Sequence, residues 1–192
     1  MGKIRPAERR TKDVARSARA TQNAPADELS ANDRLAEDLA YLRDALLYWF
    51  YERADRKRSR RYADLLEQIL NDLDEDSIVA QECRSLVAEV RGNVPKAIRH
   101  RIREIKLIRR LHQISAGRPG EEYVLSKYGI DDLSDRLDLL AILYHALGKR
   151  ERALKALSES RRLCEAHGIP FDGADLWDEY QRQGTRRPVK VV

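Results

Sequence analysis

The side chains best suited to chemistry in this chain are four histidines and two cysteines, and their spacing fits no catalytic or metal-binding pattern. None of the histidines lies four residues from another metal ligand on a helical stripe that also carries a third. They are His100, His112, His145 and His167. Cys83 and Cys164 match no zinc or redox spacing, so we interpret both as small buried side chains in a reducing compartment. With neither a glycine-rich phosphate loop nor a nucleophile elbow, the sequence predicts no enzyme, no metal and no cofactor.

One pair of residues, in contrast, suggests a catalytic function. Arg162 and His167 occur in the run R-L-C-E-A-H. This spacing resembles the R-x4-H motif of the HEPN family of small helical ribonucleases, which implies acid–base and electrostatic catalysis on an RNA phosphodiester. The polar residue usual after the family's arginine is replaced here by Leu163. His167 also has a structural explanation, because it precedes Gly168 and a cation stabilises a helix C-terminus. A ribonuclease is therefore the third of three functional hypotheses.

Positive charge is concentrated at the N-terminus. The chain has 37 Lys and Arg against 32 Asp and Glu, and residues 1–20 hold seven of the former and two of the latter. Residues 1–28 lack apolar periodicity, which predicts a disordered basic tail that binds nucleic acid weakly and without specificity. No apolar run approaches the ~20 residues of a membrane span, and no secretory signal is recognisable. We expect a soluble, cytoplasmic protein that does not bind membranes.

A basic cluster follows a run of four aromatic residues. Half of the chain's twelve aromatics lie between Tyr41 and Tyr62, including all of residues 48–51. The basic residues of this patch are Arg53, Arg56, Lys57, Arg58, Arg60 and Arg61. Aromatic rings beside arginines can stack on bases and hold phosphates, which makes an accessory nucleic-acid-binding subunit the second hypothesis. The structural alternative is a helix face buried against another element or subunit, with a solvated basic end.

A second basic cluster lies within residues 95–115. Its candidate binding residues are Arg99, Arg103, Lys106 and Arg110. They face a single acid, Glu104, and such a face attracts phosphates or acidic proteins. Residues 63–82, however, carry seven acids and no Lys or Arg, so pairing within the chain is the simpler explanation.

The elements that must position these residues are all helices. The composition favours helix, and apolar residues recur at spacings of three and four. The expected helices are 30–57, 60–73, 78–91, 95–115, 119–128, a pair that meets at Gly148 and ends at Gly168, and 174–183. Ser30 with Asp33 marks the first start. Gly92 ends the third helix, because glycine adopts the left-handed conformation of a helix C-terminus.

Two of these helix pairs share landmarks. Gly148 stands five residues before Ala153, and Gly92 stands five residues before Ala97. Small side chains at Ala141 and Ala153 allow two helices to approach closely. This arrangement resembles the tetratricopeptide repeat, most clearly at 134–167 and more weakly at 78–112. The resemblance implies antiparallel hairpins stacked as a short solenoid, and a binding role without catalysis. The alternative is an ordinary helical bundle with shared glycine caps.

In tetratricopeptide proteins the first helix of each unit lines a groove, so the resemblance also implies partner-binding residues. They are Glu82, Leu86, Glu89, Asp135, Asp138, Ile142 and His145. An acidic groove with apolar patches suits a basic or amphipathic peptide, although acids also stabilise helix N-termini without any partner. We therefore expect an all-α domain over 29–184, with a loose tail at 185–192. It acts as an adaptor or scaffold that binds another protein or a second copy of itself.

Overall fold

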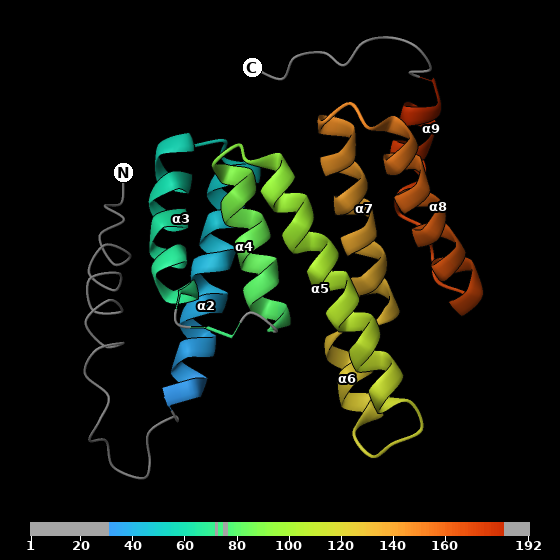
Figure 1. Cartoon of the computed structure of the whole chain (residues 1–192), viewed down its shortest axis with the longest axis horizontal. Helices are drawn as coiled ribbons and strands as arrows, with labels where there is room; N and C mark the ends of the chain where they lie inside the picture. The colour runs from blue at the N-terminus through green and yellow to red at the C-terminus, as the bar shows by residue number, and fades with distance from the viewer. Residues whose placement is uncertain (1–30, 72, 75–76, 183–192) are drawn as a thin grey trace, which may run out of the picture. The chain divides into compact units, whose positions relative to one another are not determined.

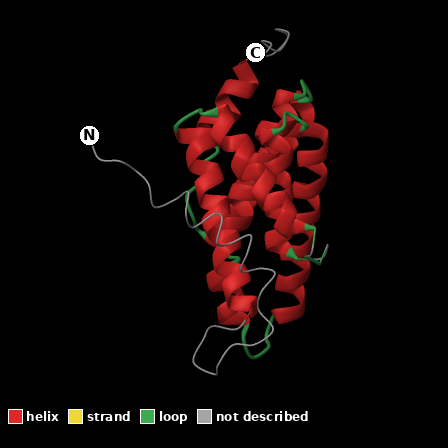
Figure 2. Ribbon diagram, turned by 90° about the vertical axis from the view of Figure 1, so that its left-hand side faces the viewer, coloured by secondary structure: helices red, strands yellow, loops and turns green. Residues whose placement is uncertain are grey.

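The computed structural model describes residues 31–71, 73–74 and 77–182 (Figure 1). The predicted tails at 1–28 and 185–192 and the predicted helix start at Ser30 lie outside these residues. All described elements are helical, as Figure 2 shows, which confirms the predicted all-α class. None of the described helices combines the length and apolar character needed to cross a membrane. The chain divides into two compact units, Met1–Ile69 and Leu70–Val192, and the predicted domain bounds at 29 and 184 lie outside the described residues.

The first unit contains α2 (Ala31–Leu47), the π-helix η1 (Tyr48–Glu52) and α3 (Arg56–Leu70). The prediction of one helix to residue 57 is wrong, because the chain changes to a π-helical turn at the aromatic run. The Arg53 N–H donates to the Tyr48 carbonyl across five residues at 3.0 Å, which is the hydrogen-bond spacing of a π-helical turn. Asp55 then starts α3, since its carboxylate accepts the N–H groups of Lys57 and Arg58.

The described helices of the second unit begin at residue 78. They are α4 (Ile78–Val90), α5 (Val94–Ser115), α6 (Glu121–Lys127), α7 (Ile130–Ala146), α8 (Arg150–His167) and α9 (Ala174–Arg182). These bounds follow the predicted ones closely. Two side chains satisfy first-turn N–H groups: Ser77 accepts from Ala80, and Asn93 accepts from Lys96. The apolar faces of α5 and α7 pack together into one core.

The α4–α5 and α7–α8 hairpins repeat the same construction at matching positions. Gly92 and Gly148 end the first helix of each at φ values of 72° and 70°. Ala97 and Ala153, five residues later, are both fully buried. Ala141 on α7 is also fully buried, and its equivalent on α4 is Ser85, whose hydroxyl donates to the Ala97 carbonyl at 3.1 Å. Small side chains therefore occupy matched positions on both hairpins, as the sequence predicts for Ala141 and Ala153.

Candidate functional surfaces

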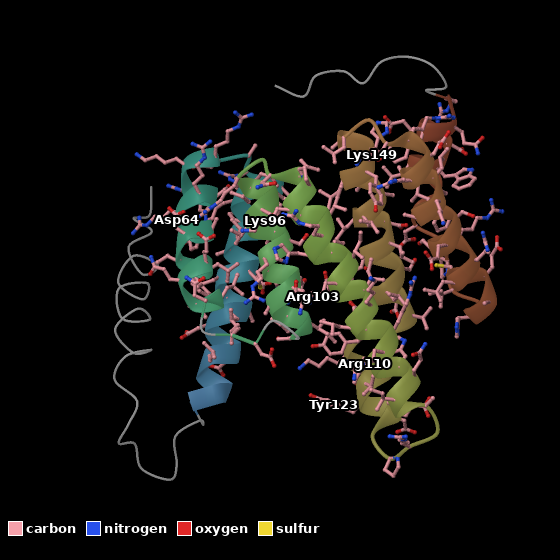
Figure 3. All side chains as sticks on the ribbon, viewed as in Figure 1. Asp64, Lys96, Arg103, Arg110, Tyr123 and Lys149 are labelled. Carbon is pink, nitrogen blue, oxygen red and sulfur yellow. The ribbon has the colours of Figure 1, made fainter. Side chains whose placement is uncertain are left out.

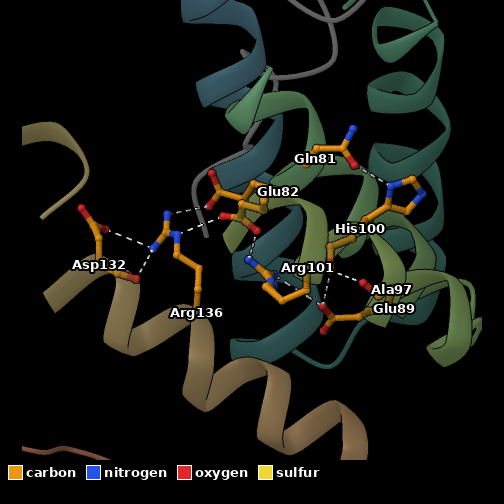
Figure 4. A network of polar contacts seen from close by, with 10 residues as sticks. Gln81, Glu82, Glu89, Ala97, His100, Arg101, Asp132 and Arg136 are labelled. Atoms are coloured by element: carbon orange, nitrogen blue, oxygen red, sulfur yellow. Dashed lines mark hydrogen bonds and ion pairs between the residues drawn. The ribbon is translucent and has the colours of Figure 1, made fainter. Parts of the chain in front are cut away.

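A buried ionic network joins α4, α5 and α7 of the second unit (Figure 4). Its centre is Glu104, which is 0% exposed. The Glu104 Oε2 accepts from the Arg101 Nη1 at 2.7 Å, and its Oε1 accepts from the Arg136 Nε at 2.9 Å. Burial raises the pKa of Glu104, while the two guanidiniums act to lower it. The Glu104 side chain is thus in the core, away from the exposed basic residues of α5.

The same network involves the first half of the expected groove. A carboxylate oxygen of Glu82 lies 3.7 Å from the Arg136 guanidinium of α7, and one of Glu89 lies 3.7 Å from that of Arg101. Leu86 is 3% exposed and belongs to the interior. The structure therefore turns these three candidates toward contacts within the chain, and Leu86 is not on an open surface. No pattern in the sequence indicates this, since Arg136 belongs to a later hairpin than Glu82.

The second half of the expected groove follows one face of α7. Asp135 and Ile142 are exposed, while Asp138 and His145 are half-buried beside the segment that leads into α9. The His145 ring stacks on the Tyr180 ring with centroids 3.9 Å apart and planes 9° from parallel. This stacking leaves Asp135 and Ile142 as the exposed members of the face.

Asp138 lies in an environment that disfavours its charged form. Burial raises its pKa to about 6, with further contributions from Asp135 and Asp172, against the effect of a hydrogen bond with Ser160. A methyl group placed on Gly173 would stand 2.9 Å from the Asp138 Oδ2, so the backbone before α9 approaches this carboxyl closely. The C-terminal segment thus restricts access to Asp138 from one side.

The outer face of α5 carries a row of positive charge (Figure 3). Between residues 96 and 112, every exposed side chain of this helix is a lysine or an arginine. These residues, which we call the α5 stripe, are Lys96, Arg99, Arg103, Lys106 and Arg110. Their spacing of three, four, three and four places them on one side of the helix over about 21 Å. The stripe contains all four basic candidates that the sequence predicts in this segment.

Arg101 and Arg109 of α5 lie outside the stripe and form ion pairs within the chain. Arg101 contacts Glu104 and Glu89 as described, and Arg109 forms an ion pair with Glu159 of α8. His100, beside the stripe, donates from its Nδ1 to the Gln81 Oε1 at 2.8 Å. Burial lowers the pKa of His100, and four neighbouring cations lower it further. They are Lys96, Arg84, Arg99 and Arg103. The surroundings of this imidazole are therefore electropositive.

The predicted aromatic and basic patch lies in the first unit. Basic residues of α3 line a surface hollow of about 480 Å³ together with Asp64. They are Arg56, Lys57, Arg60 and Arg61. Arg53 is exposed beside them, and the Arg58 guanidinium stands 4.0 Å above the Trp49 ring. No residue of η1 is fully buried: Tyr48 and Tyr51 are exposed, whereas Trp49 and Phe50 are half-buried.

The Arg162 and His167 pair does not converge. Both side chains are exposed on α8, and positions five apart on an α-helix point about 140° from one another. The Arg162 Nη2 donates to the Ser158 hydroxyl, one turn toward the N-terminus and away from His167. The two groups thus do not meet at one site in this conformation.

The cysteines and the potential metal ligands add no further site. Cys83 and Cys164 are buried and unoxidised, as predicted. Within the described part of the chain, no group of three His, Cys, Asp or Glu is arranged to hold a metal ion. Comparison with known proteins finds no matching family model, no matching curated protein and no matching solved structure.

Proposed function

We propose that this chain is a non-catalytic adaptor whose second unit binds another protein. The observation that supports this most strongly is the repeated construction of the two hairpins. Glycines with matching φ values and fully buried alanines recur at the same positions of both. Helices stacked in this way form a scaffold in which each pair supports the next, and the outward faces are then available to partners.

The surface proposed for the partner is the α7 face formed by the exposed Asp135 and Ile142, with the half-buried Asp138 between them. The spacing of three and four residues puts these side chains on one side of the helix. Ile142 is 41% exposed, which makes it an apolar contact with acidic neighbours. A partner segment that offers an apolar side chain flanked by Lys or Arg would complement this face in shape and charge.

Affinity capture from native lysate, read by mass spectrometry, tests the proposal with a matched pair of variants. Asp135→Asn/Ile142→Ser removes one acid and one apolar side chain from the α7 face. Glu122→Gln/Leu125→Ser removes the same types from α6, where Leu125 is 42% exposed. We expect the wild type and the α6 variant to retain a stoichiometric protein partner that the α7 variant loses. Equal recovery with both variants, or no stoichiometric protein with any form, would contradict the proposed function.

A further inference from the structure

We propose that the α5 stripe is a binding surface for the phosphate backbone of a nucleic-acid duplex, and that it binds without reading base sequence. This surface is distinct from the α7 face, and the inference does not depend on the adaptor function. It also differs from the aromatic and basic patch of the first unit, because the stripe belongs to α5 alone.

The stripe is uniform in sign, which is unusual for an exposed helix face. Such faces normally carry both signs, as α8 of the same unit shows. Its exposed charged side chains are Glu151, Arg152, Lys155, Glu159, Arg161, Arg162 and Glu165. Acids and bases are interspersed there, and the Arg161 Nε donates to the Glu165 Oε1 at 2.7 Å. Over residues 96–112 the exposed face of α5 includes no acid at all, so solvation of an ordinary helix surface does not account for it.

The side-chain types of the stripe favour a nucleic acid over a protein as its partner. Protein interfaces draw their affinity from buried apolar and aromatic anchors and are depleted in lysine. The stripe has no exposed apolar or aromatic residue between positions 96 and 112. Sequence-independent duplex binding needs no such anchor, since phosphate contacts provide almost all of its affinity. The stripe therefore suits a polyphosphate better than an acidic protein.

The absence of exposed rings also favours a duplex over a single strand. Proteins that bind single strands stack the bases on aromatic side chains, and none is exposed within this stretch of α5. A duplex carries one negative charge per about 1.7 Å of its axis, so a stripe of about 21 Å meets about twelve phosphates, more than its five cations require. Three of the five are arginines, whose planar guanidinium can bind a phosphate through two parallel hydrogen bonds.

The electrostatic surroundings of the stripe agree with this assignment. His100 is held in an electropositive environment to which Lys96, Arg99 and Arg103 all contribute. A polyanion bound along the stripe would therefore lie in a region of positive electrostatic potential.

The test uses the full chain and fluorescence anisotropy with a labelled DNA duplex of about 20 base pairs, at salt concentrations between about 50 and 200 mM. The stripe variant neutralises four cations: Arg99→Gln, Arg103→Gln, Lys106→Gln and Arg110→Gln. Each phosphate contact contributes about 0.9 to the slope of log affinity against log salt. The variant should therefore lose up to about 3.6 of that slope.

A control variant removes the same net charge from α8 of the same unit. It carries Arg152→Gln, Lys155→Gln, Arg161→Gln and Arg162→Gln. Since the other basic regions of the chain are unchanged in both variants, the difference between them isolates the stripe. We expect the α8 variant to keep a slope close to that of the wild type. An RNA duplex should bind about as well as DNA, because the backbone alone is contacted. The corresponding single strand and a poly-glutamate peptide should bind more weakly.

Equal loss of slope in the two variants would overturn the inference, because net charge alone would then explain binding. Tighter binding of poly-glutamate than of the duplex would assign the stripe to an acidic protein instead. A third variant, Arg99→Lys/Arg103→Lys/Arg110→Lys, keeps every charge and should keep the salt slope. If it loses binding as completely as the glutamine variant while circular dichroism shows both folded, phosphate contact by these cations is not the cause.

Discussion

Replacing Glu104 by glutamine should destabilise the second unit more than any exposed charge substitution in it. The Glu104 carboxylate lies between the Arg101 and Arg136 guanidiniums, at 2.7 and 2.9 Å. Glutamine keeps the length and volume of the side chain, so no cavity forms. The amide can accept from one guanidinium only, and its NH₂ group then faces the other. Two cations remain in the interior with their main counter-charge removed.

The magnitude follows from the burial of the three groups. The side chains of Glu104 and Arg101 are 0% and 5% exposed, and that of Arg136 is 14% exposed. Hydrogen bonds to charged groups contribute about 1.5–3 kcal/mol each, and removing one partner from a buried ionic network costs about 3–5 kcal/mol. We expect a loss near the lower end of that range, since Glu89 and Asp132 still lie beside the two guanidiniums. A domain has only about 5–15 kcal/mol of stability in total.

Urea denaturation followed by circular dichroism measures this loss, and Glu165→Gln is the control. Glu165 pairs with Arg161 at the same 2.7 Å, but both side chains are more than half exposed. Exposed pairs contribute about 0–1 kcal/mol, so the control should stay close to the wild type. The expected loss of stability requires that the two guanidiniums keep Glu104 ionised against the effect of burial. If Glu104→Gln lowers the free energy of unfolding no more than the control does, this reasoning is refuted.

Five other substitutions test the packing of α7 and α8 and the backbone conformation at Ala54 and Gly148. Burial raises the pKa of Asp138 from 3.8 to about 6, so its stabilising neutral form is fully present below pH 4 and is lost as the pH rises through 6. Asp138→Asn should therefore raise the free energy of unfolding at pH 8 by about 1 kcal/mol after allowance for solvent screening, seen as a higher thermal midpoint. It should also flatten the pH dependence of stability between about pH 4 and 6. Ala141→Leu and Ala153→Leu should each lower the free energy of unfolding in urea by about 1–3 kcal/mol, since both positions are fully buried; unmoved urea midpoints would contradict the close helix approach. Ala54 has a φ of +48°, so Ala54→Gly should stabilise the protein by up to about 1 kcal/mol. Gly148 has a φ of +70°, so Gly148→Val should destabilise it. A lower thermal midpoint for Ala54→Gly, or a higher one for Gly148→Val, would contradict this argument.

The helix bounds of the second unit could be predicted because their signals are local. Gly92 and Gly148 mark helix ends by a conformation that other residues adopt at a cost, and Pro95 suits a first turn. The apolar spacing then fixes which face is buried. None of these inferences needs knowledge of what lies across the core, and for that reason each was confirmed.

The site-level predictions failed where the answer depended on a distant partner or on unusual backbone. Nothing near Glu82 or Glu104 indicates Arg136, and nothing in residues 48–52 requires a π-helical turn rather than a continued α-helix. One signal was available. Arg101 and Glu104 stand at four- and three-residue spacing after the buried Ala97, which places both on the buried row of α5 rather than on its outer face.

The aligned hairpins differ in the buried residues of their second helices, α5 and α8. When Gly92 is aligned with Gly148, Arg101 and Glu104 correspond to Leu157 and Ser160 of α8, and all four of these side chains are buried. The first hairpin thus has an ion pair where the second has an apolar contact and a hydroxyl. Glu104 is the only acid in α5, and it is needed in the core to neutralise Arg101 and Arg136. No acid of α5 is then available to the outer face. The one acid of α5 therefore belongs to the buried network, while the exposed side chains between residues 96 and 112 are all basic.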